Sequence, residues 1–197
     1  MNGRFLLVGT VVTAIALFAW QSISNTVIPW HMATMREFAN NDAVVQAVRA
    51  NAPENGVYHS PQGVLAAVAL TPTLIDKTAL IPQMLGKQFV INLVVAFLLA
   101  LVTLRLRPAT PVRIAIALGT AGLAGSVLIE VSNWNWYGFS LPWSTVNVID
   151  HTIQWFLAGL VLAALMRRLA PAVGTDGVSV PAGAGIGHGD RTAATNR

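Results

Sequence analysis

The chain has 197 residues, of which 54% are hydrophobic and only 10% are charged, whereas soluble domains carry about 25% charged residues. This composition excludes an ordinary soluble domain and predicts one helical membrane domain with a modest extramembrane part. The net charge of +4 does not indicate a nucleic-acid-binding protein, because the arginines stand beside apolar segments and form no basic run. The absence of cysteine excludes disulfides, thiolate metal sites, iron–sulfur clusters and cysteine nucleophiles.

The first apolar stretch extends from Phe5 to Trp30 without a charged residue and follows Arg4. A cleaved signal peptide is the alternative, since Ser22-Ile-Ser24 offers small residues at a possible cleavage site. The apolar run through Trp20 is longer than the usual core of a signal peptide. We therefore expect residues 1–30 to form an uncleaved transmembrane helix.

Residues 31–86 are mixed in character and predict a small extracytoplasmic α+β cap. Asn41-Asp42 can cap a helix that Ala52-Pro53 ends. Two segments, 56–61 and 63–70, predict a pair of short strands that can form a hairpin. About fifty residues are marginal for independent stability, so we expect the cap to rest on the helices or on a partner protein.

Three further uncharged runs are long enough to span a membrane, over residues 88–104, 114–129 and 146–166. Residues 87–169 are therefore expected to hold transmembrane helices 2–4. The fold class that this predicts is an all-α membrane protein with four transmembrane helices and a small cap between helices 1 and 2. Residues 170–197 are rich in glycine, alanine and threonine without periodicity, which predicts a disordered cytoplasmic tail.

The third run carries glycines spaced three apart, at Gly119, Gly122 and Gly125. Small residues on one helix face let a neighbouring backbone approach closely. We expect this face to pack against another helix of the same chain. A seam between two copies of the protein is the less favoured alternative.

The basic residues near the apolar runs predict the orientation. Arg4, the turn 105–113 with its three arginines, and Arg167-Arg168 fall on one side, while the opposite loop 131–149 has no lysine or arginine. Short cytoplasmic segments carry the excess of basic residues in membrane proteins. We therefore expect both termini in the cytoplasm of a bacterium, the chain in its inner membrane, and the cap and the tryptophan-rich loop outside.

Four polar residues lie at the same depth, 17 or 18 residues from the cytoplasmic arginine of their helix: Gln21, Lys87, Glu130 and Asp150. At about 1.5 Å per residue, each is roughly 26 Å from the cytoplasmic boundary. The four side chains are thus predicted to share one level near the outer edge of the hydrocarbon. They are the candidate cofactor-binding residues, although a lysine and an acid at this depth can also simply compensate each other's charge.

Three histidines are candidate metal ligands on the same side: His31, His59 and His151. Together with Glu130 and Asp150 they can supply nitrogen and oxygen ligands to a divalent metal. The same groups suit a quinone headgroup or a proton relay, and no H-x-x-H or H-E-x-x-H spacing singles out a metal. The six tryptophans also fall on this side, where we expect them to anchor the protein at the interface.

Three short segments resemble small bacterial inner-membrane proteins that have four predicted helices and no assigned activity: Pro29-Trp-His31, Asn55-Gly-Val-Tyr-His59 and Trp134-Asn-Trp-Tyr-Gly-Phe139. The resemblance covers about residues 5–168. It implies a four-helix topology, and it transfers no catalytic residue.

The leading functional hypothesis is an accessory or scaffold subunit that docks to a larger membrane complex through its cap and aromatic face. The cap is too small to stand alone, and the chain carries no P-loop, G-x-G-x-x-G or G-x-S-x-G motif before or within a suitable element. The alternative is a small-molecule or ion binder, with a quinone or a divalent metal held by the polar residues at the outer interface. The expected partners are the lipid bilayer and either another membrane protein or a second copy. A transporter is less favoured, because four helices leave little room for alternating access.

Overall fold

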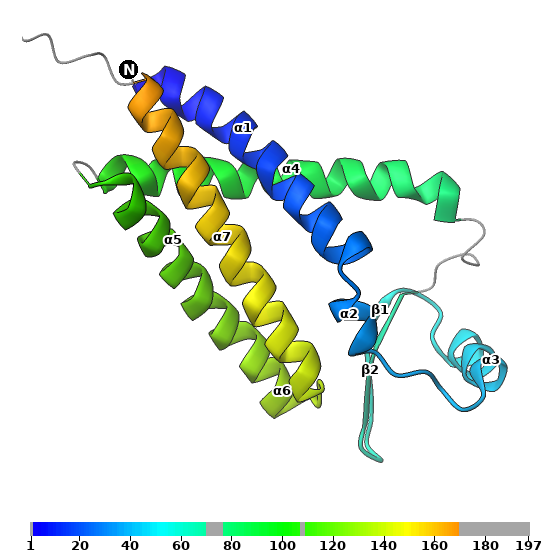
Figure 1. The fold of residues 1–197 in the computed structure, drawn as a ribbon. Helices are drawn as coiled ribbons and strands as arrows, with labels where there is room; N and C mark the ends of the chain where they lie inside the picture. The colour runs from blue at the N-terminus through cyan, green and yellow to red at the C-terminus, as the bar shows by residue number, and fades with distance from the viewer. Residues whose placement is uncertain (1, 70–76, 107–108, 170–197) are drawn as a thin grey trace, which may run out of the picture.

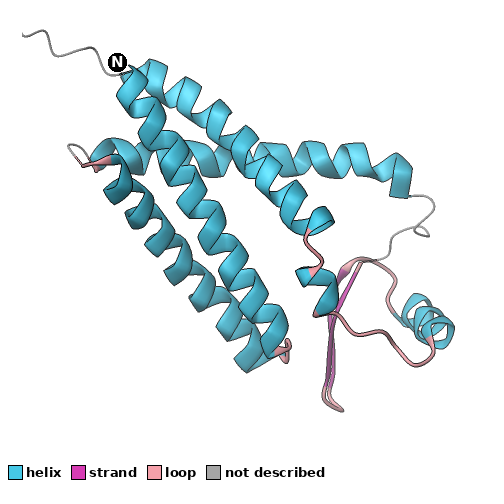
Figure 2. Cartoon of the chain, viewed as in Figure 1, coloured by secondary structure: helices cyan, strands magenta, loops and turns pink. Residues whose placement is uncertain are grey.

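The computed structural model describes residues 2–69, 77–106 and 109–169. Over these residues the protein is mostly helical, with four helices long and apolar enough to cross a membrane and one small sheet between the first two (Figures 1 and 2). The four spans cover Gly3–Val27, Ile81–Arg105, Pro111–Tyr137 and Leu141–Leu169. The prediction of four helices long and apolar enough to cross a membrane, with a two-stranded element between the first two, is confirmed. The predicted tail at 170–197 lies outside the described residues.

The first span is not one helix as far as Trp30. Helix α1 (Asn2–Ser22) passes into a π-helical turn, η1 (Ile23–Val27), and the short helix α2 (Trp30–Ala33) follows. Between them Ile28 is extended, with φ −88° and ψ 120°. Ile28 precedes Pro29, whose ring disfavours the helical conformation in the residue before it. The expected helix over 1–30 therefore ends early, and the chain turns so that α2 packs against α7 (Leu141–Leu169).

The segment between the first two spans contains the predicted helix and hairpin. Helix α3 (Asn41–Asn51) is capped by Asn40, whose side chain accepts a 2.9 Å hydrogen bond from the backbone N–H of Ala43. Strands β1 (Gly56–Ser60) and β2 (Val64–Val68) pair antiparallel, with Gly56 opposite Val68. The turn between them uses Gly63 at φ +94°, a conformation that favours glycine. The helix begins one residue after its cap, so the capping position is Asn40 and not Asn41.

Helix α4 (Lys77–Arg105) begins well before Lys87, where the sequence suggested the start of the second span. Its first part, which includes Pro82, projects away from the other helices (Figure 1). The side chains from residue 81 to residue 87 are all exposed. Part of the segment assigned to the cap is therefore helical. Lys87 lies within a helix and does not mark its end, because a single lysine is compatible with helix continuation.

The third span is longer than expected. Helix α5 (Pro111–Ser126) continues through a second π-helical turn, η2 (Val127–Val131), into α6 (Ser132–Tyr137). Gly138, at φ +71°, ends α6, and α7 begins at Leu141. The expected loop over 131–149 was wrong, since only residues 138–140 are not helical. The aromatic and amide residues of this segment do not show the helical spacing of apolar residues, so hydropathy did not predict a helix here. A helix that leaves the membrane core can form without that spacing.

Helices α5 and α7 pack along each other, and α1 packs against both α4 and α7. Small residues allow the first of these contacts: a Cβ added at Gly159 would lie 2.6 Å from Ala115 Cα, and one at Gly122 would lie 2.6 Å from Trp155 Cβ. A Cβ at Gly119 would lie 3.2 Å from Phe156 Cβ, a tight contact without overlap, whereas nothing lies within 4 Å of a Cβ at Gly125. The expected packing within the chain is thus confirmed for two of the three spaced glycines.

Candidate functional site

Helix α7 carries a stripe of larger polar side chains in its first half: Asn147, Asp150, His151 and Gln154. Their spacing of three, one and three residues puts them on one helix face. Asp150 is 5% exposed and Gln154 is 8% exposed. Buried polar groups cost free energy unless they find hydrogen-bond partners, so this stripe needs neighbours from other helices.

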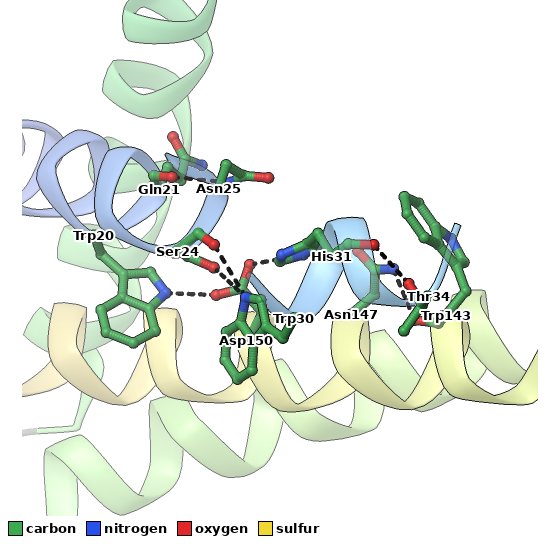
Figure 3. Close-up of polar contacts among 10 residues, drawn as sticks. All are labelled: Trp20, Gln21, Ser24, Asn25, Trp30, His31, Thr34, Trp143, Asn147 and Asp150. Atoms are coloured by element: carbon green, nitrogen blue, oxygen red, sulfur yellow. Dashed lines mark hydrogen bonds and ion pairs between the residues drawn. The ribbon is translucent and has the colours of Figure 1, made fainter. Parts of the chain in front are cut away.

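Asp150 is held by two elements that are distant in sequence. The Trp20 Nε1–H of α1 donates a 2.6 Å hydrogen bond to Oδ1, and His31 Nε2 of α2 lies 3.6 Å from Oδ2 (Figure 3). One carboxylate oxygen therefore accepts a hydrogen bond, and the other lies near a ring nitrogen of His31. His31 can reach Asp150 because the chain turns at Pro29 and brings α2 against α7.

The imidazole of His31 is packed between two indoles and only 8% of the residue is exposed. The ring centroids of Trp30 and Trp143 lie 5.6 and 6.1 Å from that of His31, both edge-to-face. Trp30 Nε1–H donates to the backbone carbonyl of Ser24 at 3.0 Å, which fastens α2 to η1 (Figure 3). His31 Nδ1 is buried without a hydrogen-bond partner. The Nδ1 atom of this tightly packed ring therefore makes no hydrogen bond.

Three amide side chains connect α1 with α4 close to the Asp150 contacts. Asn92 Nδ2–H donates to Gln21 Oε1 at 2.8 Å, and Gln88 Nε2–H donates to Asn92 Oδ1 at 3.1 Å. Gln88 also lies 3.4 Å from Gln21 Oε1. Asn92 is 2% exposed, so this is an interior cluster and not a surface one.

Residues from both clusters line a common pocket of about 500 Å³, the chamber, between α1, η1, α2, α4 and α7. Besides His31 and Asp150, its polar wall includes Gln21, Asn25, Gln88, Asn147, His151 and Gln154. Among the described residues no lysine or arginine lines it. A neighbouring cavity of about 250 Å³ shares Gln21, Gln88, His151 and Gln154 with the chamber and reaches Leu17, one helical turn further along α1.

The structure brings together two of the four candidate cofactor-binding residues. Gln21 and Asp150 both line the chamber. Lys87 is exposed on α4, and it lines neither the chamber nor the neighbouring cavity. Glu130 is 9% exposed in η2 and also lines neither. Equal depth therefore did not mean a shared site, because depth leaves open which way each side chain faces.

The three candidate metal ligands do not share one site. His31 and His151 line the chamber, whereas His59 is exposed on β1. In the described part of the chain, no group of three or more histidine, cysteine or acidic side chains is arranged to hold a metal ion. His59 belongs to the hairpin and not to the helices that line the chamber. His31 lies next to Asp150.

Several site residues were not among the sequence candidates: Trp20, Gln88, Asn92, Asn147 and Gln154. A helical pattern of amides could have indicated them, since Gln88 and Asn92 are four apart and the α7 stripe follows one helix face. Trp20, Trp30 and Trp143 take part in the site, which corrects their expected role as interface anchors alone. Trp136, at 77% exposure, fits that role.

Fold and site together describe a helical protein with four helices long and apolar enough to cross a membrane, and a half-open chamber with polar side chains between them. Comparison of the chain with protein-family models, with curated proteins and with solved structures gave no match. The chemistry of the chamber is consequently the main guide to what the protein does.

Proposed function

We propose that this chain is a multi-pass protein of the bacterial inner membrane that binds a small molecule in the chamber. Asp150 carries this proposal: it is a buried acid within a membrane span, partnered by Trp20 and His31, beside a pocket with a polar wall. Ionisable groups inside spans are costly and usually serve a function. A volume of about 500 Å³ lies within the usual range for small-molecule sites.

The distribution of basic residues supports a chamber near the periplasmic surface. Arg4, Arg105 and Arg113 stand at the ends of the spans far from Asp150, as do Arg167 and Arg168. The positive-inside rule then puts both termini in the cytoplasm and makes α3 and the hairpin a periplasmic cap. A ligand would reach the chamber from the periplasm or from the outer leaflet.

Retention of a small molecule by the purified protein tests this function. We expect native mass spectrometry in mild detergent to show wild-type protein with a bound low-mass compound, and Asn147→Leu to lose it. Asn51→Leu on α3 is a matched control, because both amides donate to the carbonyl four residues earlier, at 2.9 Å and 2.8 Å. A wild type that is empty after gentle extraction, or equal retention in both variants, would contradict the proposal.

An accessory subunit is the second candidate, and the cap favours it. Among its residues Val57 and Val64 are 74% and 61% exposed, and α3 has no buried residue. An apolar pocket of about 500 Å³ lies between the hairpin and the turn that includes Tyr137 and Phe139. Such a surface fits contact with another membrane protein. A monodisperse monomer that co-purifies with no protein from native membranes would argue against this candidate.

A further inference from the structure

The wall of the chamber carries a negative charge that no neighbouring group cancels. With the histidines counted as neutral, Asp150 is the only charged side chain among the described residues that line it. His31 supports this count, because its Nδ1 is buried without a hydrogen-bond partner. An imidazolium would carry a proton on that atom with no acceptor for it, which costs free energy. The chamber therefore favours a cationic ligand over an anionic one.

Two oxygens of the wall are free to accept hydrogen bonds. Asp150 Oδ1 accepts from Trp20, but Oδ2 lies 3.6 Å from His31 Nε2, beyond hydrogen-bond distance. Asn147 donates from Nδ2 to the backbone carbonyl of Trp143, so its Oδ1 remains to accept. Among the described residues neither Asp150 Oδ2 nor Asn147 Oδ1 has a hydrogen-bond partner, and neither atom is sealed from the surface. A ligand with hydrogen-bond donors can therefore reach both.

A primary ammonium group matches the charge and the free oxygens together. It is positively charged and has three N–H donors and no acceptor. Asn147 and Asp150 are three residues apart and rise from the same side of α7 (Figure 3), so one head group can reach both. A quaternary ammonium would supply the charge, but it has no N–H for the oxygen of Asn147.

The rest of the wall distinguishes an organic ammonium from a metal ion. Phe18, Leu85 and Trp143 line the chamber and can contact an apolar body, and aromatic rings also attract ammonium groups. A volume of about 500 Å³ is far larger than a bare ion fills. In the described part of the chain no three histidine, cysteine or acidic side chains are arranged to hold a metal.

The same lining disfavours an aminophospholipid as the source of the ammonium. The head of such a lipid carries a phosphate beside its ammonium group. The described lining residues include no lysine or arginine to pair with that phosphate. Unpaired charge is costly in such an interior, so an amine without a neighbouring anion fits best.

We infer, on the basis of the proposed binding function, that the chamber binds a free primary amine as its ammonium ion. The ammonium group pairs with Asp150 Oδ2 and donates a hydrogen bond to Asn147 Oδ1. The apolar body of the amine lies against Phe18 and Leu85. The site binds the amine without any covalent step.

Titration of the full chain with phenethylammonium in an uncharged detergent at neutral pH, followed by calorimetry, tests this inference. We expect saturable binding to the wild type. Asp150→Asn should weaken it by at least about tenfold, because asparagine can still accept from Trp20 but carries no charge. Glu130→Gln is the matched control, since it neutralises a similarly buried acid that lines neither cavity, and it should bind like wild type. Equal affinity in the two variants would contradict the inference.

Competition in the wild-type protein keeps the test independent of any variant that misfolds. Phenethyl alcohol, which has a hydroxyl in place of the ammonium, should compete at least about tenfold more weakly. Phosphoethanolamine, the head of an aminophospholipid, should not compete. Equal competition by the alcohol would overturn the cation, and equal competition by phosphoethanolamine would overturn the free amine in favour of a lipid head.

The outcome also separates this inference from the binding function on which it rests. If phenethylammonium does not bind but a compound sensitive to Asn147→Leu is retained, the amine is wrong and the binding function stands. If no compound is retained either, both fall.

Discussion

Asp150 is the residue on which separate elements converge, through Trp20 of α1 and His31 of α2. A buried carboxylate is tolerated when its oxygens are hydrogen-bonded, and removal of one partner leaves a costly unpaired group. The indole of Trp20 therefore contributes to folding through its N–H as well as through its apolar area. Through His31, Asp150 is also one of the contacts between α2 and the spans, together with Trp30 and Trp143.

Trp20→Phe should lower the free energy of unfolding by about 1 to 3 kcal/mol, because Asp150 Oδ1 loses its donor while the apolar contact is largely kept. Thermal or denaturant unfolding in mild detergent, followed by circular dichroism, measures this. Trp136→Phe makes the same chemical change at a residue that is 77% exposed and should have little effect. Equal losses in the two variants would show that the hydrogen bond contributes nothing particular.

The sequence predicted some of the individual residues of the candidate site. Depth counting found Gln21 and Asp150, because distance along a helix depends only on residue number. It could not separate them from Glu130 and Lys87, which face elsewhere. The partnership of Asp150 with His31 depends on a turn at Pro29 and on packing between helices distant in sequence. The proline is visible in the sequence, but the packing that brings α2 against α7 is not.

The position of α7 against α5 depends on glycines, whose missing side chains let the two helices approach closely. Gly159 lets the backbone of α7 approach Ala115, and Gly122 gives room to Trp155. This close packing fixes the rotation of α7, and with it the direction of the polar stripe that contains Asp150. A change in the distance between α5 and α7 should therefore move the polar side chains of α7 that line the chamber.

Gly159→Ala should destabilise the protein by about 1 to 3 kcal/mol, since its Cβ would overlap Ala115 and force the helices apart. Gly125→Ala adds the same methyl group on α5, where nothing lies within 4 Å. There the better helix propensity of alanine should leave stability unchanged or raise it by about 0.5 to 1 kcal/mol. Unfolding midpoints of the two variants compare them directly, and a stable Gly159→Ala protein would mean that the packing has slack.

The secondary-structure elements were predicted well where the hydropathy of the sequence alone determines them. Long apolar runs predicted four spans, and the two strand-like segments 56–61 and 63–70 predicted the hairpin. Amide-rich and aromatic segments were harder, because helices α6 and the start of α7 lack an apolar period. The break at Ile28 had a visible cause in Pro29, but the π-helical turn before it had no sequence signature.

The whole molecule is predicted to expose its hairpin to the periplasm and its 105–113 turn to the cytoplasm. Because the natural chain has no cysteine, single introduced cysteines report position without background. Gln62→Cys should react with a membrane-impermeant maleimide in intact spheroplasts, whereas Val112→Cys, 60% exposed beside Arg113, should react only after permeabilisation. The reverse pattern would invert the topology and place the chamber toward the cytoplasm.

The π-helical turn η2 changes which residues of the third span face the protein interior. Along α5 the buried positions include Ala115, Leu118 and Gly122, and about two turns after Gly122 an uninterrupted helix would bury Ile129. The wider turn inserts one residue and rotates the remainder of the span by roughly 100°. Ile129 is accordingly 59% exposed, and Glu130 is 9% exposed. A register slip of one residue thus exchanges an isoleucine for an acid in the protein interior.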